Sequence, residues 1–182
     1  RRRTWPRMDD TLRAAIERDL GTTIVNARRV HGGDVAIAYA LDLDDGRRAF
    51  AKTHPAAPPN FFATEAAGLE WLRAPAAIPV PEVLAVSDAP PNRLVLEWID
   101  GIKVNDYASL DTAGVDRLEA ARRTVEAYLY QFFEVGFFHA DPHPGNIFIQ
   151  PGASAAAPTV AFVDFGMVGT LSKGAKAGLR GR

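Results

Sequence analysis

The sequence has no cysteine and no long apolar run. Without cysteine, neither disulfide bonds nor thiolate chemistry can occur, and this composition is typical of a cytosolic protein. A membrane-spanning helix needs roughly 20 consecutive apolar residues, and no stretch approaches that length. The formal net charge of −1 gives no general attraction to nucleic acid. We therefore expect a cytoplasmic protein without a nucleic-acid partner. Membrane association stays possible through the basic ends, but no transmembrane segment supports it.

Two aspartates and one asparagine have a spacing that favours phosphate transfer. Asp141 and Asn146 enclose Pro-His-Pro-Gly, and Asp164 opens an Asp-Phe-Gly sequence. This is the spacing of a protein-kinase phosphotransfer site. A carboxylate such as Asp141 can orient a hydroxyl and accept its proton, and the oxygens of Asn146 and Asp164 suit Mg²⁺. The spacing predicts Asp141 as a catalytic residue and the other two as metal ligands, with ATP and Mg²⁺ as cofactors. Gly166 is expected to turn the chain after the last ligand.

Histidines on either side of Asp141 allow another interpretation. His139, Asp141 and His143 form His-x-Asp-x-His, and imidazole and carboxylate are good zinc ligands. A zinc hydrolase is therefore an alternative, although no third histidine lies near and Asn146 would have no role. In the kinase interpretation His139 is a structural residue that supports the loop.

Local patterns before residue 100 predict a small lobe with a short helix before it. Asp9 or Asp10 can cap a helix that ends near Leu20, with Gly21 as its stop. Strand and helix periodicities then predict a hairpin of residues 35–43 and 47–53, a helix at residues 61–73, and two further strands at residues 83–86 and 93–99.

The pattern becomes helical beyond Gly101. One long helix is expected at residues 113–135, and short strands at 147–149 and 160–163 flank an alanine-rich loop. The helix has apolar residues on one side, namely Leu118, Val125, Leu129 and Phe132. The printed chain ends before any Ala-Pro-Glu motif of ordinary kinases. We therefore expect no platform for a peptide substrate, and uncovered apolar surface on the long helix.

A lysine and a glutamate complete the predicted nucleotide site. Lys52 ends the second hairpin strand, and Glu65 lies in the next helix. In kinase-like folds a strand lysine binds ATP phosphates and pairs with a helix glutamate. We predict Lys52 as catalytic and nucleotide-binding and Glu65 as nucleotide-binding, with Glu70 as the rival glutamate.

Two further segments are candidates for nucleotide contact. Gly32 and Gly33 lie between strands, where backbone N–H groups can cradle phosphates, although the full glycine-loop motif of protein kinases is absent. A plain glycine turn is the alternative. The segment from Glu97 through Trp98 to Ile99 is the candidate hinge, whose backbone would bind adenine.

The sequence resembles two kinase-like families in different parts. "GFFHADPHPGNIFI" and "VAFVDFGMVG" resemble the UbiB-type (ABC1) atypical kinases, over residues 94–172. "GGDVAIAYALDLDDGRRAFAKT", "FFATEAAGLEWLR" and "IPVPEVLAVSDAPPNRLVLEWID" are similar to the small lobe of fructosamine kinases, over residues 10–100. The two meet at "LVLEWIDG", which suggests a chimera joined at the hinge.

The predicted fold is α+β and protein-kinase-like, with an antiparallel-sheet small lobe and a truncated, mainly helical large lobe. We expect a basic tail with a helix at residues 1–21, the small lobe at 22–99 and the large lobe at 100–182. The resemblances imply phosphate transfer to a small-molecule or sugar-adduct hydroxyl, such as a glycated amine, or a UbiB-like ATPase or kinase activity. The alternative is a nucleotide-binding module, or a chimeric fragment, without turnover.

Overall fold

The computed structural model describes residues 7–30, 36–73, 78–172 and 174. Its contacts divide the chain into two compact units. The first comprises Arg1–Ala67 with Pro81–Trp98, and the second Gly68–Val80 with Ile99–Arg182. The chain therefore passes between the units three times, and the last passage lies between Trp98 and Ile99, inside the candidate hinge.

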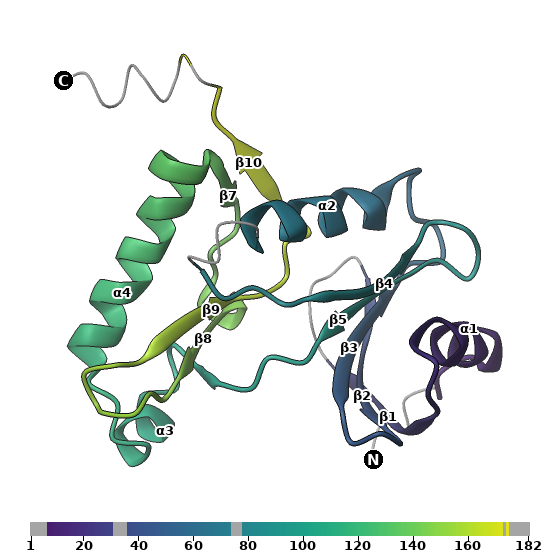
Figure 1. Ribbon diagram of the computed structural model, residues 1–182, viewed down its shortest axis with the longest axis horizontal. Helices are drawn as coiled ribbons and strands as arrows, with labels where there is room; N and C mark the ends of the chain where they lie inside the picture. Colours follow the sequence, from purple (N-terminus) through teal and green to yellow (C-terminus); the bar gives the residue numbers. More distant parts are fainter. Residues whose placement is uncertain (1–6, 31–35, 74–77, 173, 175–182) are drawn as a thin grey trace, which may run out of the picture. The chain divides into compact units, whose positions relative to one another are not determined.

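The first unit is built on a five-stranded antiparallel sheet in the order β1-β2-β3-β5-β4 (Figure 1). Its strands are β1 (Ile24–Val30), β2 (Ile37–Leu43), β3 (Arg48–Thr53), β4 (Val83–Ser87) and β5 (Arg93–Glu97). The predicted hairpin is confirmed as β2–β3, with Ile37 opposite Thr53 and Asp42 opposite Arg48. The predicted elements left out β1, whose exposed and half-buried positions include Asn26, Arg28 and Arg29.

Helix α1 (Asp10–Leu20) covers one face of this sheet and shares its core. The predicted caps are confirmed, because the Asp9 side chain accepts the N–H groups of Thr11 and Leu12, and Gly21 is left-handed with φ 65°. Buried apolar residues from the helix and the sheet meet there, among them Leu12, Ile16, Leu41 and Val95. An ion pair of 2.6 Å between Asp19 and Arg93 adds a polar link from the helix to β5.

Helix α2 has the predicted bounds, Phe61–Arg73, and begins in the first unit. The carboxylate of Asp88, in the loop between β4 and β5, accepts the N–H groups of Phe62 and Ala63 at 3.0 and 3.3 Å. This side chain satisfies N–H groups of the first turn that have no partner within the helix. The buried side chains include Phe62, Glu65, Ala66, Leu69 and Leu72, at the spacing of one helical face.

The second unit contains two small antiparallel sheets and a helical segment (Figure 1). One sheet has the order β6-β8-β9, and the other pairs β10 with β7. The strands are β6 (Ile102–Lys103), β7 (Phe137–His139), β8 (Ile147–Gln150), β9 (Thr159–Phe162) and β10 (Val168–Thr170). Sequence patterns had predicted β8 and β9, and their register pairs Ile147 with Phe162 and Gln150 with Thr159.

The prediction of one continuous helix at residues 113–135 is wrong. The structure has α3 (Tyr107–Thr112), a break, α4 (Arg117–Tyr130) and a π-helical turn η1 (Gln131–Val135). Gly114 is left-handed with φ 68° and ends the first helix. Asp116 then starts the second, because its side chain accepts the N–H groups of Leu118 and Glu119.

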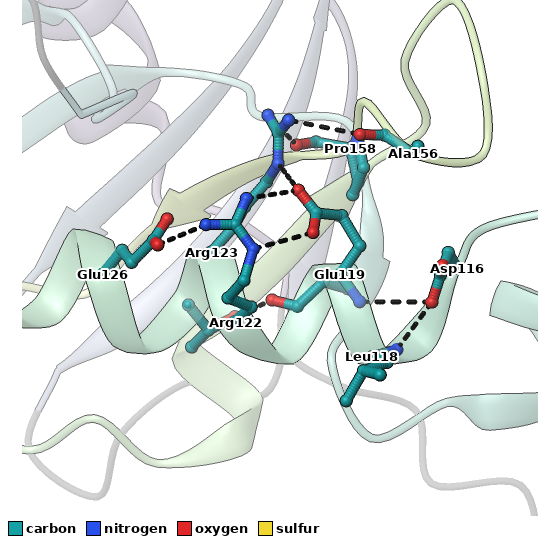
Figure 2. Close-up of polar contacts among 10 residues, drawn as sticks. Asp116, Leu118, Glu119, Arg122, Arg123, Glu126, Ala156 and Pro158 are labelled. Atoms are coloured by element: carbon teal, nitrogen blue, oxygen red, sulfur yellow. Dashed lines mark hydrogen bonds and ion pairs between the residues drawn. The ribbon is translucent and has the colours of Figure 1, made fainter.

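Helix α4 carries a network of charged side chains (Figure 2). Arg122 bonds Glu119 at 2.6 Å and also pairs with Glu126, while Arg123 bonds Glu119 at 2.7 Å. These bonds to both arginines lower the pKa of the Glu119 carboxyl to about 2. Arg123 also donates to the carbonyl oxygens of Pro158 and Ala156, so this network holds the alanine-rich loop against the helix.

The apolar side of α4 is exposed, as the sequence led us to expect. Leu118, Val125 and Leu129 are 81%, 56% and 45% exposed. The helix packs against β9 with its other side, where Ala120 is buried and the Tyr128 ring stacks on Phe162 with centroids 6.5 Å apart. None of the helices in the described ranges is long and apolar enough to cross a bilayer.

Candidate functional site

Lys52 and Glu65 meet in the first unit. The Lys52 Nζ donates to Glu65 Oε1 at 2.7 Å, and the two side chains are only 7% and 4% exposed. Strand alternation explains this position, because Ala51 faces the core shared with α1 and the next residue points to the opposite side of the sheet. Glu65 lies on the buried face of α2, whereas the rival Glu70 is exposed. The structure thus brings together the pair that the sequence singled out.

The loop after β7 carries Asp141 and Asn146 in the second unit. Asp141 is exposed, and its carbonyl oxygen accepts the N–H of His143 at 2.7 Å and the Asn146 Nδ2 at 3.3 Å. A short 3-10 turn, η2 (Pro144–Asn146), closes the loop and leads directly into β8. The Asn146 side-chain amide is therefore oriented through its nitrogen, and Oδ1 remains available as a ligand atom.

His139 supports this loop from the interior. Its side chain is fully buried, Nδ1 accepts the Asp141 N–H at 3.1 Å, and Nε2 lies 3.0 Å from the carbonyl oxygen of Val163. Because Nδ1 accepts, Nε2 carries the proton and donates to Val163. One ring thus connects the segment of Asp141 to the residue before Asp164. Both nitrogens are engaged, so His-x-Asp-x-His has no zinc-ligating geometry here.

Two residues that the sequence analysis did not single out hold His139 in place. Gln131 in η1 accepts the His139 N–H at 3.0 Å, and Tyr128 donates its hydroxyl to the His139 carbonyl at 3.0 Å. Burial raises the pKa of the Tyr128 phenol, which keeps this donor protonated. Gln131 is fully buried. A glutamine within a helical pattern ordinarily predicts a surface residue, so no sequence signal indicated this role.

Asp164 has an unusual backbone conformation. Its φ is 64°, in the left-handed region that non-glycine residues seldom adopt, although aspartate tolerates it better than most. Gly166 does not have a positive φ, and a Cβ there would meet only Asp164 Oδ1 at 3.5 Å. The chain does turn at Phe165 and Gly166, as expected, but the left-handed conformation belongs to Asp164 and not to the glycine.

The segment of Asp164 is fixed against the loop that carries Asn146. The Val163 N–H donates to the Asn146 carbonyl at 2.9 Å, and the buried Phe165 ring lies 4.8 Å from the His139 ring. Two potential oxygen ligands thus come from neighbouring segments of one unit, which fits a hard cation such as Mg²⁺. Among the described residues there is no group of three histidines, cysteines or carboxylates that could hold a metal.

The candidate hinge connects the two units. The Glu97 N–H donates to the Glu82 carbonyl at 2.8 Å, and the Trp98 N–H donates to the Arg48 carbonyl at 3.4 Å. Within the described part of the chain, no residue accepts a hydrogen bond from the Ile99 N–H. Gly32 and Gly33 lie outside the described residues, so their predicted phosphate contact stays a prediction.

The fold defines a protein-kinase-like chain of the α+β class, and comparison with solved structures supports this class. The chain is similar to the Rio2 kinase of Chaetomium thermophilum, solved as an ADP/Mg²⁺–phosphoaspartate complex, with a TM-score of 0.62 and 18% identity. That match covers 88% of this chain and 52% of Rio2. A putative fructosamine-3-kinase of Thermobifida fusca gives a TM-score of 0.55 at 16% identity, over 89% of this chain and 75% of the other.

The sequence comparison then identifies the family. Residues 62–181 match the model of the ABC1 atypical kinase-like domain, and the chain belongs to this family. ACTIVITY OF BC1 COMPLEX KINASE 8, a chloroplastic protein of Arabidopsis thaliana, is 38% identical over 127 residues, or 70% of this chain. The probable protein kinase UbiB of Marinobacter nauticus is 46% identical over 79 residues, or 43% of this chain. The chain spans only 15% and 14% of the lengths of these two relatives.

These comparisons refine the predicted resemblances. The UbiB-type resemblance is confirmed, and the match begins at residue 62, earlier than the expected residue 94. It therefore includes helix α2 and Glu65 as well as the aspartates of the second unit. The likeness to the fructosamine kinases holds at the level of the fold. The predicted junction of two families at the hinge thus gives way to one family that extends across it.

Proposed function

We propose that this chain binds ATP with Mg²⁺ and transfers the terminal phosphoryl group to a hydroxyl. The buried Lys52–Glu65 pair carries this proposal. Burying two charges costs several kcal/mol per ion before their attraction offsets it, and a buried pair is weak evidence for a stabilising role. A task for the ammonium group at the phosphates explains why a lysine and a glutamate occupy such positions.

Each remaining residue has a role in this proposal. Asn146 and Asp164 would hold Mg²⁺ through their oxygens, and the metal would neutralise charge on the phosphates. Asp141 would orient the acceptor hydroxyl and take its proton. The acceptor oxygen forms a bond to the terminal phosphorus, the bond from that phosphorus to the bridging oxygen breaks, and ADP leaves with the electron pair. Catalysis would come from positioning and charge stabilisation.

Adenine would be recognised by the backbone of the hinge. The Glu97 and Trp98 N–H groups are engaged within the first unit, which leaves the Ile99 N–H as the donor for a ring nitrogen of the base. The Glu97 carbonyl would accept from the exocyclic amine. Gly32 and Gly33 would contact the phosphates through their N–H groups.

The acceptor is the open part of this proposal. The fructosamine-kinase likeness favours a sugar hydroxyl of a glycated amine, and membership of the ABC1 family favours a UbiB-like ATPase or kinase activity. The family match includes Asp141, Asn146 and Asp164, so we prefer the UbiB-like ATPase or kinase activity. In this version of the proposal, the protein is cytoplasmic and contacts a membrane surface. The Arabidopsis relative, in contrast, is chloroplastic by name.

A nucleotide titration of the purified chain tests the proposal. Mg·ATP should raise the unfolding temperature, and ADP and phosphate should appear with time. Asp164→Ala should abolish both effects, because it removes a metal ligand. Binding without turnover would support the nucleotide-binding module instead. Unchanged Mg²⁺-dependent ATP affinity in Asp164→Ala would refute the role of Asp164 as a metal ligand.

A further inference from the structure

His143 lies between the proposed base and a proposed metal ligand, and its two ring nitrogens are in different situations. The side chain is exposed, and Nδ1 accepts the N–H of Gly145 at 3.1 Å. This contact caps the 3-10 turn that ends at Asn146. Because Nδ1 accepts, the proton of the neutral ring is on Nε2. Among the described residues, none accepts a hydrogen bond from that Nε2–H.

Comparison with two other histidines shows what is particular to His143. His139 and His54 also accept a backbone N–H two residues ahead through Nδ1, at 3.1 and 3.0 Å. The His139 ring is buried and its Nε2 is bound to Val163. His54 belongs to the first unit, with its ring against Phe61 at 5.5 Å. His143 combines a structural contact at one nitrogen with a solvent-accessible donor in the loop of Asp141.

In β7 and the loop that follows it, residues 137–146, three side chains contain nitrogen. His139 is engaged at both ring nitrogens, and Asn146 Nδ2 donates to the Asp141 carbonyl. The donors of this loop that remain are therefore the Nε2–H of His143 and the second hydrogen of Asn146 Nδ2. Asn146 is assigned to the metal through Oδ1, which leaves His143 as the candidate donor to a phosphoryl oxygen. In phosphoryl transfer, negative charge is spread over three oxygens in the transition state, and preorganised donors stabilise it.

We propose that His143 donates its Nε2–H to an oxygen of the phosphoryl group in transit, while its Nδ1 holds the turn that carries Asn146. This inference rests on the proposed phosphotransfer and adds a residue to it. His143 gives up no proton in the step. The hydroxyl proton of the acceptor, or of water in an ATPase reaction, goes to Asp141, and the electron pair of the broken bond leaves with ADP.

Two substitutions separate the roles of the two nitrogens. His143→Asn keeps an acceptor near the position of Nδ1 but has no donor at the position of Nε2. His143→Gln provides an N–H near Nε2 and loses the acceptor. A hydrogen bond to a charged group contributes enough to change a rate about 10- to 100-fold. We expect His143→Asn to lower the kcat of ATP turnover by this factor with an unchanged affinity for Mg·ADP, and His143→Gln to retain most of the kcat. His54→Asn and His54→Gln are matched controls and should change neither quantity.

A spectroscopic measurement tests the contact without turnover. In protein labelled with ¹⁵N-histidine, the Nε2–H signal of His143 should shift and exchange more slowly when Mg·ADP with aluminium fluoride is added. Aluminium fluoride replaces the phosphoryl group, so Mg·ADP alone should leave the signal nearly unchanged. The His54 signal is the internal reference.

The outcomes distinguish this inference from the proposed function. If wild-type protein turns over ATP and His143→Asn does so at the same rate, His143 is only a cap and the inference is wrong. Loss of Mg·ADP affinity in both His143 variants would also show that His143 has only a structural role and that the inference is wrong. If wild-type protein binds Mg·ADP but shows no turnover, the proposed function fails, and the response to aluminium fluoride still decides whether His143 is the donor. Absence of any nucleotide binding refutes both.

Discussion

Lys52 and Glu65 are buried and paired in the first unit, whereas Asp141 lies on an exposed loop of the second unit. The Lys52–Glu65 pair is held by side-chain packing between a strand and a helix. The loop is held by backbone hydrogen bonds and by one buried histidine beneath it. Because an exposed carboxylate contributes little to packing, substitutions at Asp141 should affect chemistry. Substitutions in the buried pair should affect both chemistry and the stability of the fold.

The largest effect is expected for Asp141→Asn, which keeps the shape of the side chain and removes the base. Phosphotransfer should fall by about 10²–10⁴, the usual contribution of a positioned base, and ATP affinity should stay unchanged. The unfolding midpoint should also be that of wild type, because Asp141 is exposed. Steady-state kinetics with thermal unfolding measure all three quantities. A loss of binding as large as the loss of turnover would make Asp141 a structural or metal residue.

In the buried pair, Lys52→Met should lower both stability and ATP affinity. It leaves the Glu65 carboxylate buried without the ammonium 2.7 Å away, and breaking such a pair costs about 3–5 kcal/mol. Glu65→Gln should weaken ATP binding less. Denaturant unfolding and calorimetric titration measure the two effects.

The double variant Lys52→Met with Glu65→Gln tests whether the two residues act together. It should lose little more ATP affinity than Lys52→Met alone, and it should be more stable than that single variant, because no uncompensated charge remains. Fully additive losses would show that the two side chains do not meet.

His139 is the buried residue beneath the exposed loop of Asp141. His139→Leu should therefore lower stability as well as turnover, as substitutions in the buried Lys52–Glu65 pair do. It leaves the part-buried Asp141 N–H and Val163 carbonyl without their partner, and a group that no water reaches then costs about 1–3 kcal/mol. Turnover should fall because the loop and the Asp164 segment lose their common support. His54→Leu, which loses a similar contact to a backbone N–H outside this loop, is the control. Equal stability losses in the two variants would contradict the supporting role of His139.

The smallest effect is expected at the surface of α4 and depends on pH. The pKa of Glu119 is lowered from 4.5 to about 2 by its bonds to Arg122 and Arg123. A lowered pKa stabilises the folded state above the unfolded value, and this contribution is lost as the pH falls through the folded value. Wild type should therefore unfold at a slightly higher temperature than Glu119→Gln at pH 7, with the difference shrinking between pH 4.5 and 2. A difference that persists below pH 2 would point to packing instead of charge.

The sequence predicted much of this architecture because many of its signals are local. The caps of α1, the hairpin β2–β3 and the bounds of α2 follow from turn residues and apolar periodicity. The spacing of Asp141, Asn146 and Asp164 indicated one site, and the structure links the last two through the hydrogen bond between Val163 and Asn146. Their roles in catalysis stay predictions.

Helix α4 shows where local signals were insufficient. The apolar side is exposed as expected, but no local signal indicated that the side with Ala120 and Tyr128 packs against β9. Periodicity reports which residues share a face, but not which strand supplies the opposing surface. The break near Gly114 was also missed, because glycine is compatible with a helix at a modest cost and the Asp116 cap was not recognised.

The sequence by itself indicated the class of the chain, because motif spacing is a property of residues close together along the chain. The same spacing predicts Asn146 and Asp164 as oxygen ligands, and the kinase-like pattern predicted the pairing of Lys52 with Glu65, which the structure confirms. Only the tertiary structure decided that Asp164 has a left-handed backbone with a φ of 64°, and that Gln131 and Tyr128 hold His139. These features depend on which groups are left without partners once strands and helices pack. A buried backbone group must find a hydrogen bond wherever the fold provides one, and that location is not encoded in its neighbours along the chain.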